Sequence, residues 1–565
     1  MMDREREVDV VVIGMGPGGE HAAGTLAEAG LAVAGVEGRL VGGECPYWGC
    51  IPSKMMIRAG DLLAEARRIP GMAGRAEVHA DWSPVARRIR DEATDNWDDT
   101  VAADRFTGLG GILVRGHGRI TAPGEVTVAP AAGPDGAPQV LRASRGIVIA
   151  TGTKPAVPPI PGLAGTPFWT NHEAIEAERV PESLVVLGGG AVGAELAQVF
   201  ARFGSRVTIV EGADRLLHLE EPEAGDLLAG VFGRDGITVR TGRRAAGVAF
   251  SPASGFTVTL DGGEEVSGAA LLVATGRRTD LAAVGTGAVG IDEQLRAIPV
   301  DGHMRAAPGV WALGDITGKG AFTHMSMYQA EIVINDILGR DGWSAEYDAV
   351  PRVTFTDPEI GAVGLTEREA RERGLTVRTS VKQVPETARG WIHKAGNDGF
   401  IKLVEDCDRG VLAGATSVGP WGGEVLGALT VAVHAAVPVQ RLREMIYAYP
   451  TFHRGIEDAL AGLGSQGRAG ARVTRRGCPR PRRSRRPPST TPRERLPPVE
   501  SGHGRVRPRR PAESGHSLSR RPLKVPLRRA VIRPGNAPEP QPMGYRSGRL
   551  ARGSAGLGPV TGEAG

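Results

Sequence analysis

The chain has 565 residues, which is too long for a single hydrophobic core, so several domains are expected. Its formal net charge of +4 is the sum of two segments of opposite charge. From Gly462 onward there are 24 Arg and Lys against 5 Glu, so residues 1–461 carry a net negative charge. An acidic body argues against a nucleic-acid surface, and no apolar run of signal-peptide or membrane-spanning type follows the acidic N-terminus. We therefore expect a cytoplasmic protein that acts on a small molecule, with no nucleic-acid and no membrane partner.

The first predicted element is a βαβ unit at residues 9–37, DVVVIGMGPGGEHAAGTLAEAGLAVAGVE. Its first strand and helix are joined by the order G-x-G-x-x-G at Gly14, Gly16 and Gly19. The first glycine permits a tight turn, the second lets a pyrophosphate approach the backbone, and the third lets helix and strand pack. Glu37 ends the second strand, where an acid accepts hydrogen bonds from a ribose.

The segment GGECPYWGCIPSK places Cys45 and Cys50 five positions apart. In a continuous helix this offset rises about 7.5 Å, beyond the usual Cα separation of a disulfide, so we expect Cys45 on a turn. Pro52 fits the first turn of a helix and would leave Cys50 at its positive end, where a thiolate is favoured, with Lys54 as a candidate cation. We expect a working disulfide in reducing surroundings.

Three alternatives for this pair are two buried free thiols, a static disulfide and a metal site. A zinc site needs about four ligands, and neither a second cysteine pair nor a histidine cluster lies nearby in the sequence. No metal site is therefore predicted.

A second βαβ unit at residues 183–211 repeats the pattern, with the same spacing of 23 from its first glycine to Glu211. Two copies with equal spacing predict two dinucleotide sites, and structural units without ligands are the alternative. An acid at the ribose repels the additional phosphate of NADP, so NADH is expected to be preferred over NADPH. Each copy is followed by a strand ending in Ala-Thr-Gly, and a later Gly-Asp pair is expected to return to the first domain. These positions are Gly188, Gly190 and Gly193 in the second fingerprint, Thr151, Gly152 and Gly276 in the Ala-Thr-Gly elements, and Gly314 and Asp315 in the Gly-Asp pair.

From about Tyr347 onward, the strand-like PRVTFTDPEIGAVGLT, the helix EREARERG and the strands FIKLVEDC and VLAGATSVG predict a separate α+β domain. Its last helix is expected to begin near Pro450. After Leu463 the sequence is rich in Arg, Pro and Ser, and we expect it to be disordered. A nucleic-acid- or membrane-binding arm is the alternative, and the excess of Arg over Lys also fits GC-rich DNA translated in another frame.

Six motifs, in this order, resemble the FAD-dependent pyridine nucleotide-disulfide oxidoreductases, the family of lipoamide dehydrogenase, glutathione reductase and mercuric reductase. They are GMGPGG, GGECPYWGCIPSK, IATG, GGGAVGAE, LGDITG and TFTDPEIGAVGLTE, and the resemblance covers about Val8 to Leu460. It implies that the first fingerprint and Asp315 hold FAD and that the second fingerprint holds the nicotinamide nucleotide. Gly43, Thr151, Gly152, Gly276 and Gly314 are expected to contribute to these two cofactor sites.

The resemblance also implies roles for four side chains around the flavin. Cys50 would face the flavin, and Cys45 would exchange electrons with the acceptor. Lys54 is similar to the lysine near the flavin, and Glu195 resembles its ion-pair partner.

The chain departs from the family at the C-terminal motif His-Pro-Thr-x-x-Glu, which here reads Tyr-Pro-Thr-Phe-His-Arg. Tyr449 stands at the position of the catalytic histidine, and Arg454 at the position of the glutamate that would orient it. A tyrosine here is similar to mercuric reductase, but the C-terminal cysteine pair of that enzyme has no counterpart. His453, expected one helical turn beyond Tyr449, is a candidate replacement base, and a structural histidine is the alternative.

We therefore predict an α/β fold with two Rossmann-like dinucleotide-binding domains and a C-terminal α+β dimerisation domain. The predicted function is transfer of hydride from NADH through FAD to the Cys45–Cys50 disulfide, and on to a disulfide or related acceptor, in a homodimer. The alternatives are a quinone- or diaphorase-type reductase, a mercuric-type reductase and a flavin-binding non-catalytic remnant. The predicted domains are 1–155 and 279–345 for FAD, 156–278 for NAD, 346–461 for dimerisation and 462–565 for the disordered tail.

Overall fold

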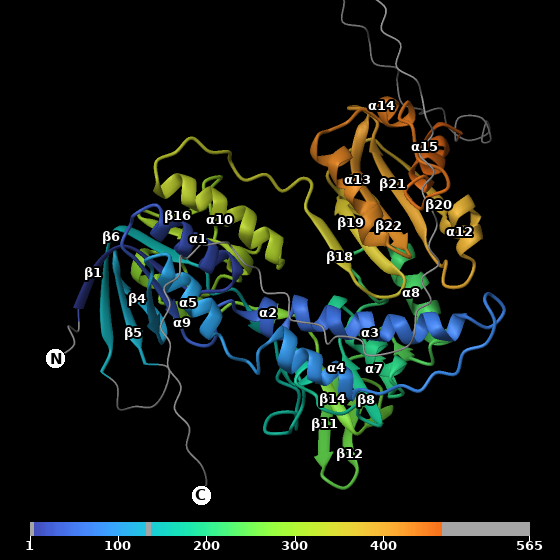
Figure 1. Ribbon diagram of the computed structural model, residues 1–565, viewed down its shortest axis with the longest axis horizontal. Coiled ribbons are helices and arrows are strands. Elements are labelled where there is room, and N and C mark those ends of the chain that lie inside the picture. Colours follow the sequence, from blue (N-terminus) through green and yellow to red (C-terminus); the bar gives the residue numbers. More distant parts are fainter. Residues whose placement is uncertain (1–4, 131–136, 466–565) are drawn as a thin grey trace, which may run out of the picture. The chain divides into compact units, whose positions relative to one another are not determined.

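The computed structural model describes residues 5–130 and 137–465 (Figure 1). From residue 466 onward, the predicted disordered tail lies outside the described residues. Within the described part of the chain, no helix combines the length and apolar character that a membrane crossing needs.

The first sheet has eight strands, and its centre is parallel. The strands are β1 (Glu5–Ile13), β2 (Val33–Glu37), β3 (Ile112–Arg115), β4 (His117–Ala122), β5 (Glu125–Ala129), β6 (Gln139–Ile149), β16 (Arg305–Ala307) and β17 (Val310–Ala312). β1 lies between β2 and β6 and is parallel to both, and β17 continues the sheet parallel to β6. The hairpin of β4 and β5 joins β6 in antiparallel pairing.

Both faces of this sheet are buried, which explains the continuous apolar run in β1. Val10 and Val12 pack with the helices α1 (Pro17–Glu28) and α10 (Thr323–Ile337). Val11 and Ile13 point to the opposite face and pack with the β4–β5 hairpin. Alternate residues of a strand face opposite sides, so a parallel strand covered on both faces reads as uniformly apolar.

The Gly-Asp pair, Gly314 and Asp315, follows β17 after one intervening residue. Because β17 pairs with β6, this part of the chain returns to the first sheet as predicted.

The second sheet is parallel in the order β10-β9-β8-β14. Its strands are β8 (Ser183–Leu187), β9 (Arg206–Val210), β10 (Thr238–Arg240) and β14 (Ala270–Val273), with the helices α7 (Ala191–Arg202) and α8 (Pro222–Arg234). An antiparallel sheet of β11 (Ala245–Ser251), β12 (Gly255–Leu260) and β13 (Glu265–Gly268) packs on the face that α7 and α8 leave free. Side chains of β8 again alternate between the two layers.

Two short antiparallel strands lie where the chain passes between these sheets. β7 (Lys154–Pro155) pairs with β15 (Arg277–Arg278). The predicted domain divisions after residues 155 and 278 fall at the ends of these strands and stay predictions.

The C-terminal domain is an antiparallel five-stranded sheet in the order β18-β19-β22-β21-β20. Its strands are β18 (Pro351–Thr354), β19 (Glu359–Gly364), β20 (Val377–Gln383), β21 (Phe400–Asp406) and β22 (Val411–Gly419). The helix α13 (Gly422–His434) lies against β19 and β22, and α15 (Gly455–Ser465) packs on β20 and β21 (Figure 1). The predicted α/β fold with an α+β C-terminal domain is confirmed.

The last helix begins at Gly455, later than the expected start near Pro450. The intervening residues close turns instead, because the amide of Arg454 bonds to the Thr451 hydroxyl and the amide of Gly455 to the carbonyl of Phe452. The remaining helical segments are α4 (Ser83–Arg88), the π-helix η1 (Ile89–Ala93), α5 (Thr100–Gly108), α6 (Asn171–Ile175), α9 (Leu281–Val284), η2 (Thr286–Val289), η3 (Gly314–Thr317), α11 (Glu367–Glu372), η4 (Val384–Glu386), α12 (Ala388–His393) and α14 (Val439–Arg443), besides the two that carry the cysteines.

Candidate active site

The two cysteines lie on consecutive helices with a break between them. Cys45 is in α2 (Glu44–Trp48), and Cys50 is the first residue of α3 (Cys50–Arg68). The prediction that Cys45 lies on a turn is therefore wrong: it lies in a helix of a single turn, which Pro46 tolerates because a first-turn proline forfeits no hydrogen bond. The expected helix N-terminus at Cys50 is confirmed.

Gly49 makes the break between the two helices tight. A Cβ at Gly49 would stand 3.1 Å from the carbonyl oxygen of Glu44 and 3.3 Å from the Cα of Cys45. The first backbone hydrogen bond of α3 then runs from the Ser53 amide to the Gly49 carbonyl, at 3.1 Å. Because the chain folds back this closely, each of the two sulfurs affects the pKa of the other.

The two thiols of this pair titrate unequally. The hydrogen bond with Cys45 lowers the pKa of Cys50 to about 6, helped by a hydrogen bond with Thr323 and by the charge of Lys54, and opposed by burial. The same sulfur–sulfur hydrogen bond, together with burial, raises the pKa of Cys45 far above its ordinary value. In the reduced pair, Cys50 is therefore the thiolate and Cys45 is the thiol that donates to it.

Lys54 lies one turn after Cys50 on α3 and is held by Glu195 of α7. Its Nζ is 2.8 Å from one carboxylate oxygen of Glu195, and the other oxygen accepts a 2.8 Å hydrogen bond from the Phe355 amide. Glu195 is only 6% exposed, so the carboxylate is buried. The expected pairing of Lys54 with Glu195 is present, and the roles of both side chains in the chemistry stay predictions.

The two glycine fingerprints have the same backbone geometry. Gly14 and Gly188 have positive φ angles of 93° and 109°, which glycine adopts without strain. A Cβ at the third glycine of either copy would stand 2.0 Å from the carbonyl oxygen of the first. The second glycines, Gly16 and Gly190, differ from these, because a Cβ there would meet no atom within 4 Å. Open space therefore lies at the N-terminus of α1 and of α7, where helix amides favour a phosphate.

Each glutamate that ends a βαβ unit is hydrogen-bonded to the glycine loop of the same unit. Glu37 accepts hydrogen bonds from the Met15 amide at 2.8 Å and from the amide two residues after itself at 2.7 Å. Glu211 does the same with the Gly189 amide at 2.5 Å and with the amide two residues later at 2.7 Å. Burial raises the pKa of Glu37. The two carboxylates are thus fixed at equivalent positions, with lone pairs left to accept from a ribose.

The other predicted cofactor residues surround the same loops. A Cβ at Gly43, in the cysteine motif, would stand 2.8 Å from the Cα of Gly16. The Ala-Thr-Gly element with Thr151 and Gly152 begins at Ala150, whose carbonyl oxygen would lie 2.6 Å from a Cβ at Gly14. The element that ends at Gly276 is placed equivalently, since a Cβ at Gly188 would stand 2.3 Å from the Ala274 carbonyl oxygen.

Asp315 belongs to a polar chain that the sequence analysis missed. The Thr153 hydroxyl donates to Asp315 at 2.7 Å and accepts from Nε of Arg277 at 2.8 Å. Arg277 also lies 3.4 Å from Glu44, the residue before Cys45. A signal was available, because Thr153 and Arg277 each follow an Ala-Thr-Gly directly.

The C-terminal candidates lie apart from the cysteines. Tyr449 is 69% exposed, and the Arg454 guanidinium lies 5.3 Å from the centre of its ring. Residues 449–454 are not helical, so the prediction that His453 lies one helical turn beyond Tyr449 is wrong. Within residues 5–130 and 137–465, the ring contacts of Tyr449 and His453 are with Arg454 and Tyr447, and no hydrogen bond joins either side chain to Cys45 or Cys50.

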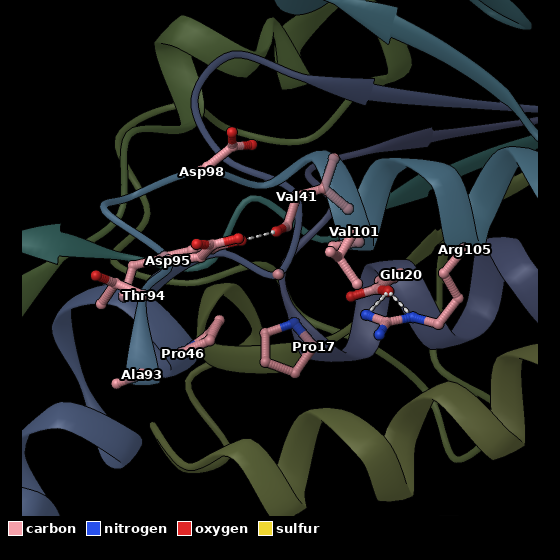
Figure 2. Close-up of a pocket in the computed structure, with 13 residues that line it drawn as sticks. Pro17, Glu20, Val41, Pro46, Ala93, Thr94, Asp95, Asp98, Val101 and Arg105 are labelled. Atoms are coloured by element: carbon pink, nitrogen blue, oxygen red, sulfur yellow. Dashed lines mark hydrogen bonds and ion pairs between the residues drawn. The ribbon is translucent and has the colours of Figure 1, made fainter. Parts of the chain in front are cut away.

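A cavity of about 350 Å³ opens beside α2 (Figure 2). Pro46, the residue after Cys45, lines it together with residues of α1, η1 and α5. Figure 2 shows Glu20 and Arg105 paired on one wall, and an ion pair joins them. The lining residues are Pro17, Glu20, Val41, Gly42, Pro46, Tyr47, Ala93, Thr94, Asp95, Asp98, Val101, Ala102 and Arg105.

Comparison with known proteins identifies the arrangement. Residues 8–330 match the family Pyridine nucleotide-disulphide oxidoreductase, and residues 350–460 match its dimerisation domain. The chain belongs to this family. It is therefore an FAD-dependent pyridine nucleotide-disulfide oxidoreductase, and the dimerisation domain supports a homodimer.

Similar proteins of this family fall into more than one activity. The chain is 34% identical to a dihydrolipoyl dehydrogenase of Chlorobaculum tepidum over 477 residues, covering 81% of this chain and 98% of that protein. It is 32% identical to a mercuric reductase of Acidithiobacillus ferrooxidans over 459 residues, covering 80% and 82%. Among solved structures, the copper(II) complex of the flavoprotein disulfide reductase RclA from Escherichia coli aligns with a TM-score of 0.71 and 26% identity, covering 81% of this chain and 99% of that one.

The residues of this pyridine nucleotide-disulfide oxidoreductase fit the FAD that the family uses. The open space at Gly16 has room for a pyrophosphate at the N-terminus of α1, and Glu37 is fixed where it could accept a hydrogen bond from a ribose. Gly43 leaves room for the cysteine motif to approach the same loop. The second loop, at Gly190 and Glu211, offers the equivalent geometry to a pyridine nucleotide.

The unequal pKa values of the cysteines predict selective alkylation. We expect Cys50 of the reduced protein to react with iodoacetamide at a rate that rises with pH and is half-maximal near pH 6, because only the thiolate is nucleophilic. Cys45 is expected to react only in much more alkaline solution. Mass spectrometry of the tryptic peptide 40–54, with fragmentation to assign the label, measures both rates. Preferential labelling of Cys45, or equal midpoints for the two thiols, would contradict the assignment.

Proposed function

We propose that this enzyme transfers two electrons from NADH through FAD to the Cys45–Cys50 disulfide and then to a small-molecule disulfide. The observation that carries the proposal is the break at Gly49, which folds the chain so that Cys45 and Cys50 lie close together. In this arrangement the pKa of Cys50 is lowered and the pKa of Cys45 is raised. Two inert structural cysteines would not need this asymmetry. The similar dihydrolipoyl dehydrogenases support an acceptor of the lipoamide type.

When bound at the first glycine loop, FAD would supply the transfer of an electron pair between the nicotinamide and the sulfurs. Reduction of the Cys45–Cys50 disulfide by two electrons and one proton yields the Cys45 thiol and the Cys50 thiolate. Cys45, once deprotonated, attacks the acceptor disulfide and releases the first thiol. Cys50 then attacks Cys45 in the mixed disulfide, which releases the second thiol and restores the starting bond. The net reaction consumes NADH, one proton and one disulfide, and forms two thiols.

We propose that the acceptor enters the cavity beside Pro46. The cavity is next to the cysteine that the sequence assigns to exchange, and its lining is partly apolar. Glu20, Asp95 and Asp98 line it against the single cation Arg105, which is already paired with Glu20. This charge balance favours neutral or cationic disulfides over anionic ones.

Tyr449 and His453 are proposed as candidates for the proton transfer that exchange requires. In this chain they lie apart from the cysteines, so we propose that the partner subunit of the homodimer brings them to the site.

We propose that NADH is the preferred nucleotide, since the carboxylate of Glu211 is fixed on the second fingerprint loop. A phosphate on the ribose would meet this negative charge. Arg244 lies beside Gly212, and its positive charge would partly offset the repulsion of the phosphate. The preference for NADH over NADPH is therefore expected to come from the carboxylate of Glu211.

Replacing Cys45 tests the proposed function directly. Cys45→Ser is expected to lower NADH-dependent reduction of lipoamide by at least about a hundredfold, because exchange with the acceptor requires this sulfur. Reduction of a quinone, which needs only the flavin, should stay within about twofold of wild type and serves as the control. Steady-state assays with both acceptors measure this. Undiminished lipoamide reduction by the variant would favour a diaphorase-type enzyme instead.

Filling the cavity tests the acceptor site. Val101 lines the cavity, yet it is 68% exposed, so Val101→Trp should fold normally. We expect the KM for the disulfide acceptor to rise by about tenfold, while reduction of the flavin by NADH, followed by stopped-flow absorbance, is unchanged. Val101→Ala is the matched control. Equal KM values in the Trp and Ala variants would place the acceptor elsewhere.

Neutralising Glu211 tests the nucleotide preference. We expect wild type to use NADH with a higher kcat/KM than NADPH, and Glu211→Gln to reduce that ratio by about tenfold because the repulsion of the phosphate is lost. Glu37→Gln, at the equivalent position of the first fingerprint, is the control and should leave the ratio unchanged. A wild-type ratio near one would refute the argument from charge.

A further inference from the structure

The hydroxyl of Thr323 touches the redox pair from a distant part of the sequence. Its Oγ1 lies 3.4 Å from Sγ of Cys50, although 273 residues separate the two. Thr323 is the first residue of α10, so the sulfur of Cys50 stands close to the N-terminal residues of two helices, α3 and α10.

The position of Thr323 is fixed by packing around α10. Gln329, which is fully buried, accepts from the Gly314 amide at 2.7 Å and donates to the Tyr347 hydroxyl at 3.0 Å. The start of the helix also lies against α1, since a Cβ at Gly18 would stand 2.7 Å from the carbonyl oxygen of Ser326. A hydroxyl on a first turn held in this way has a defined direction toward the sulfur.

The direction of the hydrogen bond follows from the protonation state of the sulfur. A thiolate can only accept, so the Thr323 hydroxyl donates to it, and donation to a charged acceptor is stronger than donation to a neutral one. The nearby cation contributes less, because Lys54 is paired with the buried carboxylate of Glu195. The effect of the Thr323 hydrogen bond on the Cys50 thiol also exceeds that of the Lys54 charge.

We propose that Thr323 is a third member of the redox centre, whose hydroxyl stabilises the Cys50 thiolate and thereby keeps Cys45 as the exchanging thiol. In the reduction of the disulfide, two electrons and one proton enter. The proton resides on Cys45, and the charge on Cys50 is held by the Thr323 hydroxyl. Loss of the hydroxyl therefore raises the pKa of Cys50 and disfavours the reduced pair. The inference rests on the proposed dithiol chemistry.

The test compares Thr323→Val, which keeps the shape but loses the hydroxyl, with Thr323→Ser, which keeps the hydroxyl. Both are placed in a Cys45→Ala background, so that Cys50 is the one cysteine in the tryptic peptide 40–54. The FAD-loaded proteins are titrated with pH, and the long-wavelength absorbance of a thiolate against the flavin is recorded. The rate of iodoacetamide labelling of Cys50 gives a second measure that does not depend on the flavin or on turnover.

We expect the midpoint for Cys50 to rise by about one pH unit in Thr323→Val and to stay within a few tenths of the background in Thr323→Ser. With both cysteines present, the disulfide of Thr323→Val should equilibrate about tenfold less favourably with dithiothreitol, a shift of about 30 mV. The Ser protein again serves as the control.

Equal Cys50 midpoints in the Val and Ser proteins would overturn the role of Thr323, whatever the acceptor is. Failure of the proposed function gives a different result, because undiminished lipoamide reduction by Cys45→Ser would leave the midpoint shift of Thr323→Val in place. A shift in both the Val and the Ser proteins would also overturn the proposal, since it would show that packing rather than the hydroxyl sets the pKa.

Discussion

The chemistry proposed for this protein depends on the closeness of two sulfurs that a regular helix would hold apart. Gly49 interrupts the helix between Cys45 and Cys50 and lets the chain fold back against the start of α2. The second cysteine then begins a helix of 19 residues, whose N-terminal end favours negative charge. A single proton shared unequally between the sulfurs makes one of them a thiolate and the other a thiol. The division of labour within the pair follows from this backbone break.

Two βαβ units of the fold have the same arrangement of glycine loop and carboxylate, which suits binding of a dinucleotide. Each βαβ unit presents a glycine loop with open space at its second glycine, and each closes the loop with a carboxylate held by two backbone amides. Glu37 and Glu211 have the same spacing from their glycines and accept from equivalent backbone amides. Each carboxylate therefore stabilises its glycine loop and keeps lone pairs that could accept from a ribose. The cysteine motif meets the first loop at Gly43, so the two sulfurs belong with the loop that is predicted to hold FAD.

Local patterns in the sequence were sufficient for much of this architecture. The spacing of glycines and acids identified both nucleotide units, and Pro52 correctly indicated the start of the helix at Cys50. The prediction for Cys45 failed because Pro46 is compatible with the first turn of a helix as well as with a non-helical turn. Likewise, hydrogen bonds of Thr451 and Phe452 replace the helical turn that the sequence suggested around His453.

What sequence could not supply are the contacts that depend on packing between distant elements. Thr323 reaches Cys50 only because α10 lies against α1, and no spacing near either residue signals it. The positions of Thr153 and Arg277 after the two Ala-Thr-Gly elements could have been noticed in the sequence, but not that they join Asp315 to Glu44. Such interactions follow from the relative placement of sheets and helices, which the local pattern of residues does not encode.

An anaerobic titration of the FAD-loaded protein with dithionite tests the central claim most directly. Two electrons should enter the sulfur pair before the flavin is reduced. The first equivalent is therefore predicted to produce a long-wavelength thiolate–flavin absorbance while the yellow colour of oxidised flavin persists. The second equivalent should then bleach the flavin. Bleaching with the first equivalent, without any long-wavelength absorbance, would contradict the claim that Cys45 and Cys50 exchange electrons with the flavin.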